Sequence, residues 1–219
     1  MSMLLLMKLF ESTPSRYDRG IRWLIGGRLE SVYDRLTAYV KPGDSVLDLG
    51  CGTGALSLRA AKRGARVKAI DINPGMLDRA RSKAKEANLS QRVEFVEMGV
   101  AELEKEEDQN YDAVMSGLCL SELNDGELDH TIREVHRILK TGGLFLVVDE
   151  VRPKNLFRRF INSLFRALLK AFIFLISGTT TRGLKDFESR IERNGFRIIS
   201  SQLNKGQNFL EVVVKKIKV

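Results

Sequence analysis

The sequence contains few of the residues that build disulfide scaffolds, cysteine-based zinc sites or membrane spans. Cys51 and Cys119 are its only cysteines, and they form no C-x-x-C pair. We therefore expect no disulfide framework and no metal, and a reducing, cytoplasmic setting is indicated. No apolar run reaches the roughly 18 residues that span a bilayer. The short apolar run Leu4–Met7 lacks the basic region and cleavage site of a signal peptide.

The charge balance is basic, because 36 Lys and Arg residues outnumber 28 Asp and Glu residues and give a net charge of +8. This favours anionic partners such as nucleic acid, an acidic membrane surface or an anionic ligand. A solvated basic surface is the alternative explanation. The 219 residues, 43% hydrophobic and 29% charged, suit one globular domain that can carry a small lid.

Apolar strands alternate with helices along the middle of the chain. The predicted strands are Ser45–Leu49, Ala65–Ile70, Val93–Val96, Tyr111–Ser116 and Leu144–Val148. The predicted helices are Leu29–Val40, which Pro42-Gly43 stops, Ala55–Lys62, Gly75–Ala87, Glu127–Leu139, which a turn at Lys140–Gly143 closes, and roughly Arg182–Arg193. This alternation predicts βαβ units. Near the end, strands Phe196–Ser200 and Phe209–Val214 are close enough for an antiparallel hairpin. We expect an α/β fold of the doubly wound type, with a mainly parallel seven-stranded sheet and an antiparallel C-terminal strand.

A glycine-rich turn carries the strongest chemical signal. In Val46–Gly54 (VLDLGCGTG) a strand runs into three glycines that precede a helix. Glycines let the backbone approach a ligand closely, and the helix N-terminus offers free N–H groups. Asp71 follows the second strand about 20 residues later, where a carboxylate can accept hydrogen bonds from a ribose diol. Together they predict a nucleoside site.

The pattern leaves the class of nucleoside open at first. Gly50, Gly52 and Ala55 also satisfy the loose dinucleotide pattern G-x-G-x-x-G/A of dehydrogenases. Gly54 makes the run G-x-G-x-G instead, and the loop holds no Lys or Arg to clamp a diphosphate. Asp48 would repel a pyrophosphate but suits a cationic ligand.

The motifs in combination resemble a known family. Residues 46–54 and 69–77 (AIDINPGML), with Tyr111–Ser116 and Arg137–Gly143, are similar to class I S-adenosylmethionine methyltransferases. More narrowly, they resemble the ubiquinone/menaquinone-biosynthesis C-methyltransferase group. The stretch Arg16–Arg22 also resembles archaeal corrinoid-associated methyltransferases.

The resemblance implies S-adenosylmethionine as cofactor and S-adenosylhomocysteine as product. The implied cofactor contacts are Asp48, Gly50, Gly52, Thr53, Gly54, Asp71, Ile72, Met76, Val100, Ala101 and Ser116. The loop would hold the methionine part, with Asp48 by the amino group or sulfonium and Ser116 behind the sulfonium. Asp71 would hold the ribose. Many relatives carry an acidic or amide residue at the Val100 position, so here only the backbone could bind the adenine edge.

The order of the predicted elements divides the chain into four segments. They are an N-terminal helical segment (1–40), a cofactor-binding α/β core (41–151), an inserted helical lid (152–182), and a final helix with a β-hairpin that completes the core (183–219).

Methyl transfer from a sulfonium has a neutral leaving group, so most of the catalysis is positioning and desolvation. A carbon or weakly acidic oxygen acceptor also needs a general base. The residues expected near the mouth of the site are Tyr17, Cys119, Ser121, Glu122, Asp149 and Glu150. The three chosen as catalytic candidates are Asp149 after the fifth strand, Glu122 after the fourth, and Tyr17 near the start. His130 and His136 stand six residues apart on one helix, so they face different directions and are expected to be structural.

The stretch 155–176 is amphipathic, with two apolar rows at helical spacing. From position 152 to 170 its polar residues include the cations Arg152, Lys154, Arg158, Arg159, Arg166 and Lys170 and no acid. The stretch can pack on the domain or on a second subunit of a homodimer, close over the site as a lid, or lie on an anionic membrane. The last two readings indicate an apolar acceptor.

The leading hypothesis is therefore an S-adenosylmethionine-dependent methyltransferase acting on a small, apolar or membrane-associated molecule, in the cytoplasm or at the membrane periphery. One alternative is an RNA methyltransferase, suggested by the +8 charge but less favoured because no aromatic-rich RNA-binding platform is visible. Another is a non-catalytic module that binds the cofactor and a partner such as a corrinoid protein.

Overall fold

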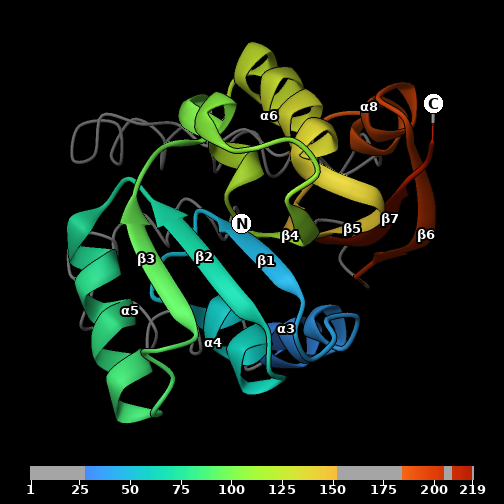
Figure 1. Cartoon of the computed structure of the whole chain (residues 1–219). Helices are drawn as coiled ribbons and strands as arrows, with labels where there is room; N and C mark the ends of the chain where they lie inside the picture. The colour runs from blue at the N-terminus through green and yellow to red at the C-terminus, as the bar shows by residue number, and fades with distance from the viewer. Residues whose placement is uncertain (1–27, 152–183, 205–208, 219) are drawn as a thin grey trace, which may run out of the picture.

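A computed structural model describes residues 28–151, 184–204 and 209–218 (Figure 1). Its strands are β1 (Ser45–Leu49), β2 (Arg66–Asp71), β3 (Val93–Glu97), β4 (Tyr111–Gly117), β5 (Leu139–Glu150), β6 (Phe196–Leu203) and β7 (Phe209–Lys216). Its helices are α3 (Arg28–Thr37), α4 (Ala55–Lys62), α5 (Pro74–Glu86), α6 (Asp125–Ile138) and α8 (Phe187–Arg193), with 3-10 turns η1 (Val100–Lys105) and η2 (Leu120–Glu122).

All seven strands form one sheet in the order β3-β2-β1-β4-β5-β7-β6. The strands from β3 to β5 in that order run parallel, whereas β7 pairs antiparallel with both β5 and β6. The predicted doubly wound α/β fold is confirmed. The order changes direction beside β1, whose neighbours are β2 and β4. In open sheets of this type, ligands bind at the carboxyl ends of the strands at such a switch point.

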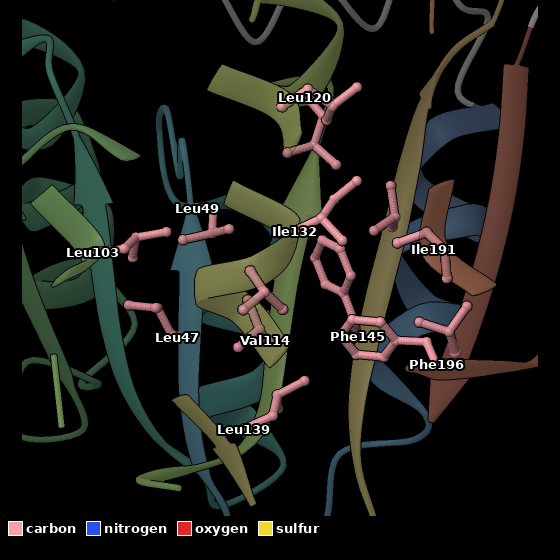
Figure 2. Packing of buried hydrophobic residues seen from close by; sticks show 14 of the residues in the cluster. Leu47, Leu49, Leu103, Val114, Leu120, Ile132, Leu139, Phe145, Ile191 and Phe196 are labelled. Atoms are coloured by element: carbon pink, nitrogen blue, oxygen red, sulfur yellow. The ribbon is translucent and has the colours of Figure 1, made fainter. Parts of the chain in front are cut away.

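Two apolar clusters fasten helices to the two faces of the sheet. Helices α3, α4 and α5 pack on one face, and η1, α6 and α8 pack on the other. Figure 2 shows the second cluster, in which Phe145 of β5 lies beside Phe196 of β6, with ring centroids 6.2 Å apart. Both faces of the central strands are buried, so buried apolar residues occupy consecutive positions, as in Val46-Leu47 of β1 and Ala113–Met115 of β4, instead of alternating with exposed ones.

Side-chain caps fix where two helices begin. The Asn73 side chain accepts hydrogen bonds from the N–H groups of Gly75 and Met76 at the start of α5, and Pro74 needs no N–H partner there. At the start of α6, Asn124 and Glu127 each accept a hydrogen bond from the other's backbone N–H.

Several element boundaries differ from the sequence predictions. Lys140–Gly143, predicted as the turn before the fifth strand, are part of β5, where the pairing jumps from Leu139 opposite Tyr111 to Leu144 opposite Ala113. Gly142 has φ +81°, so these residues form a bulge within the strand. Helix α3 ends at Thr37, before the predicted stop at Pro42-Gly43, and α8 begins at Phe187 rather than at residue 182.

The predicted lid at 152–182, the amphipathic stretch 155–176 and most of the segment 1–40 lie outside the described residues. In the part of the chain that the structure describes, no helix is long and apolar enough to cross a membrane.

Candidate active site

A cavity of about 220 Å³ opens at the carboxyl ends of β1, β2, β3 and β4. It therefore lies at the switch point of the sheet. Its lining comes from four segments that are distant in sequence: Gly50 and Gly52; Asp71, Ile72, Asn73 and Met76; Met98, Gly99 and Val100; and Gly117, Leu118, Cys119, Glu122 and Leu123.

The glycine loop needs its glycines for two different reasons. Gly50, Gly52 and Gly54 have φ values of +62°, +53° and +81°, a left-handed conformation that side chains disfavour. A Cβ on Gly50 would lie 2.6 Å from the Cβ of Cys119 and closer still to its Sγ. A Cβ on Gly54 would lie 3.3 Å from the Cβ of Ala80 on α5. Gly50 thus lets the segment after β4 approach the loop, and Gly54 lets α4 approach α5.

The carboxylate of Asp71 organises the polar part of the cavity lining. Its Oδ2 accepts a hydrogen bond from the Gly52 N–H at 2.8 Å, and its Oδ1 accepts one from the Asn73 N–H at 2.9 Å. Burial raises its pKa, while these N–H groups oppose that rise. The carboxylate therefore ties the glycine loop to the start of α5, and each of its oxygens, having accepted one N–H, can accept a further hydrogen bond.

Apolar side chains contribute much of the remaining lining. Ile72 is 75% exposed, an unusual position for a β-branched side chain, whereas Met76 and Met98 are buried. A Cβ on Gly99 would lie 3.4 Å from the Cγ2 of Ile72. The N–H of Gly99 donates to the Glu102 carboxylate, which holds the backbone at the start of η1. A flat ring fits chemically between such side chains.

The structure brings six of the predicted cofactor residues to the cavity lining, namely Gly50, Gly52, Asp71, Ile72, Met76 and Val100. The other five lie near the same strand ends without lining it.

Each of those five residues has contacts elsewhere in the core or on the surface. Asp48 is buried against α4 and accepts a hydrogen bond from the Ser57 hydroxyl, and burial raises its pKa to about 7. Thr53 Oγ1 accepts one from Lys83 Nζ at 2.9 Å. Gly54 contacts α5, Ala101 is exposed on η1, and Ser116 is fully buried in β4.

The three catalytic candidates have different positions. Glu122 lines the cavity. Asp149 is fully buried at the end of β5, where burial raises its pKa to about 7. Tyr17 lies outside the described residues. Among the residues that the structure describes, no cluster of His, Cys, Asp and Glu side chains could hold a metal ion.

Several lining residues were not singled out from the sequence. Asn73 could have been recognised as a helix cap from the Asn-Pro pair before α5. Gly117, Leu118 and Leu123 follow β4, and only the strand order places them beside β1. Tyr33 of α3 lies close to Gly117, since a Cβ on that glycine would be 3.2 Å from the Tyr33 hydroxyl. No local sequence signal links two residues so far apart.

Comparisons with known proteins agree with this geometry. Residues 46–143 match the family described as methyltransferase domain. The chain is 32% identical over 169 residues to an uncharacterised methyltransferase of Synechocystis, spanning 76% of this chain and 73% of that protein. It is 31% identical over 195 residues to a demethylmenaquinone methyltransferase of Lactobacillus johnsonii, spanning 81% and 78% of the two chains. The solved structure of geranyl diphosphate methyltransferase in complex with S-adenosylmethionine shares the fold, with a TM-score of 0.68 and 14% identity over 92% of this chain and 91% of that one.

Proposed function

The chain belongs to the class I S-adenosylmethionine methyltransferases of the ubiquinone/menaquinone C-methyltransferase type, and we propose that it methylates a ring carbon of an apolar, quinone-related small molecule. Its cofactor is S-adenosylmethionine. The observation that carries the proposal is the cavity at the switch point, whose lining combines a glycine loop and a carboxylate with apolar side chains.

The cavity residues suit the parts of the cofactor in order. Asp71 is free to accept hydrogen bonds from a ribose diol while its two N–H donors keep it in place. Ile72 and Met76 would contact the adenine ring, and Val100 offers it an apolar edge. The loop at Gly50 and Gly52 would approach the methionine part. The other five predicted residues do not line the cavity and would support the residues that do; they are Asp48, Thr53, Gly54, Ala101 and Ser116.

When bound, the cofactor supplies a methyl group from its sulfonium: the new carbon–carbon bond forms as the carbon–sulfur bond breaks, sulfur keeps the electron pair, and the acceptor carbon loses its proton. In this proposal, Glu122 accepts that proton, because it is the catalytic candidate that lines the cavity. Tyr17 stays a candidate for the same task.

The test is transfer of a labelled methyl group to a demethylated naphthoquinol that carries a prenyl tail. We expect label in the organic phase with the wild-type protein. The Glu122→Gln variant should lose at least tenfold in rate while it binds S-adenosylhomocysteine with unchanged affinity. Label in RNA and none in the quinol would support the RNA alternative, and cofactor binding without transfer to either would support the partner-binding alternative.

The proposal also includes a peripheral contact with the membrane. It is supported by the amphipathic, acid-free sequence around residues 155–176, since cations beside an apolar row suit an anionic lipid surface. Sedimentation with anionic vesicles, but not with neutral ones, is expected. Charge reversal at Arg158 and Arg159 should abolish it, and equal sedimentation of that variant would contradict a membrane role.

A further inference from the structure

The carboxyl group of Asp149 is buried behind one wall of the cavity. Its exposed fraction is 0%, and it is not among the lining residues. Its Oδ2 accepts a hydrogen bond from the Ser121 N–H at 3.0 Å, and its Oδ1 accepts one from the Glu150 N–H at 2.7 Å. The side chain is therefore oriented by the backbone around it and is separated from a ligand in the cavity by residues that do line it.

Ser121 is in the middle of that wall, which we define as residues Leu118–Leu123 and call the wall segment. Leu118, Cys119, Glu122 and Leu123 of this segment line the cavity. Its conformation is not favoured locally, because Leu118 has φ +64° and η2 is a single short 3-10 turn. The Leu118 N–H donates to the Val148 carbonyl at 2.8 Å, so β5 fixes one end of the segment.

We propose that Asp149 is a positioning residue, which fixes the wall segment by accepting the Ser121 N–H and so keeps Glu122 and Cys119 at the cofactor. This inference deepens the proposed function by assigning a task to β5 in the same site. It requires that the cavity bind S-adenosylmethionine but not that the acceptor be a quinone. Loss of the acceptor would leave a buried N–H without a partner, which is costly, and the segment would leave its position.

Asp149→Asn tests this in the full chain. Asparagine keeps the shape, but its NH₂ group would face one of the two N–H donors. We expect roughly tenfold weaker binding of S-adenosylhomocysteine by calorimetry and at least tenfold faster hydrogen exchange at the Ser121 amide, on the scale of one lost buried hydrogen bond. The matched control is Asp112→Asn, because Asp112 accepts the Ser45 N–H at 2.9 Å from the opposite end of the sheet. That control should bind S-adenosylhomocysteine like the wild type.

Unchanged affinity and unchanged exchange at Ser121 in Asp149→Asn would overturn the proposal. Unchanged affinity with a lower transfer rate would also overturn it, since that is the behaviour of a general base. If the variant does not fold, amide hydrogen exchange of the wild-type protein tests the proposal instead. Saturating S-adenosylhomocysteine should slow exchange at the Ser121 amide more than at the Ser45 amide, and equal slowing at the two would overturn the proposal. Because none of these readouts uses the acceptor, they remain valid if the quinone proposal fails.

Discussion

At the scale of single residues, the glycines of the loop meet two different requirements, a positive φ and a close contact with a neighbouring segment, which the sequence does not distinguish. Gly50 and Gly52 both have left-handed φ, but a Cβ on Gly52 has nothing within 4 Å. The motif explains why both positions are glycine in general terms. It does not predict the contact of Gly50 with Cys119, which arises because β1 and β4 are neighbours in the sheet. Asp71 could be predicted because a strand end and a glycine loop about 20 residues apart define its place. The Asp149–Ser121 hydrogen bond could not, since it joins β5 to a turn after β4.

The two glycines therefore give a matched pair of variants. Gly50→Ala should lower the free energy of unfolding by roughly 2–4 kcal/mol, because strain at positive φ is added to overlap with Cys119. Gly52→Ala should cost about 1–2 kcal/mol from φ alone. Urea denaturation measures both. Adding Cys119→Gly should recover much of the difference for Gly50→Ala, and equal losses in the two single variants would refute the steric explanation.

At the scale of elements, the alternation of apolar strands with helices predicts β1 to β5, and the C-terminal hairpin pattern predicts β6 and β7. A large boundary error concerns the start of β5. Two consecutive glycines after a helix indicate a turn, yet here they form a bulge in a strand that begins at Leu139. The pairing partner Tyr111 is 28 positions earlier in the chain, so local sequence carries no sign of it. The starts of α5 and α6 lie within two residues of the predicted starts, and each is fixed by a capping side chain that acts on the next three residues.

The capping residues of α5 and α6 differ in their position relative to the cavity. Asn73 caps α5 and lines the cavity, whereas Asn124 caps α6 and is not among the lining residues. Asn73→Ala and Asn124→Ala should each lower the free energy of unfolding by about 1 kcal/mol. Only Asn73→Ala should also weaken binding of S-adenosylhomocysteine, by a few-fold. Thermal unfolding and calorimetry check the pair, and an equal effect of both variants on affinity would contradict this assignment.

At the scale of the whole molecule, the sheet places two carboxyl groups, Asp48 and Asp149, where water does not reach them. Burial raises the pKa of each from its ordinary value of 3.8 to about 7. The folded state then holds protons that the unfolded chain has released between about pH 4 and pH 7. Stability from these groups is present at low pH and is lost as the pH rises through 7. Both carboxyls lie at the carboxyl ends of their strands, beside the cavity.

The sign of this linkage can be measured. Between pH 5 and 8, the free energy of unfolding of the wild type relative to Asp48→Asn should fall with rising pH, by at most about 1.4 kcal/mol per pH unit for one proton. His136, whose pKa is lowered by burial, acts in the opposite direction and cancels in this difference. Chemical denaturation at several pH values provides the data. A difference that does not change with pH would mean that Asp48 is ionised throughout.

The central claim is that the cavity beside β1 binds the cofactor through Asp71, and calorimetric titration with S-adenosylhomocysteine tests it most directly. The control variant is Asp78→Ala, which removes an exposed carboxylate of α5 that pairs with Arg81 on the same helix. We expect micromolar binding by the wild type and by Asp78→Ala, and at least tenfold weaker binding by Asp71→Ala, because the ribose hydroxyls lose their acceptor. Wild-type affinity in Asp71→Ala would contradict the site assignment.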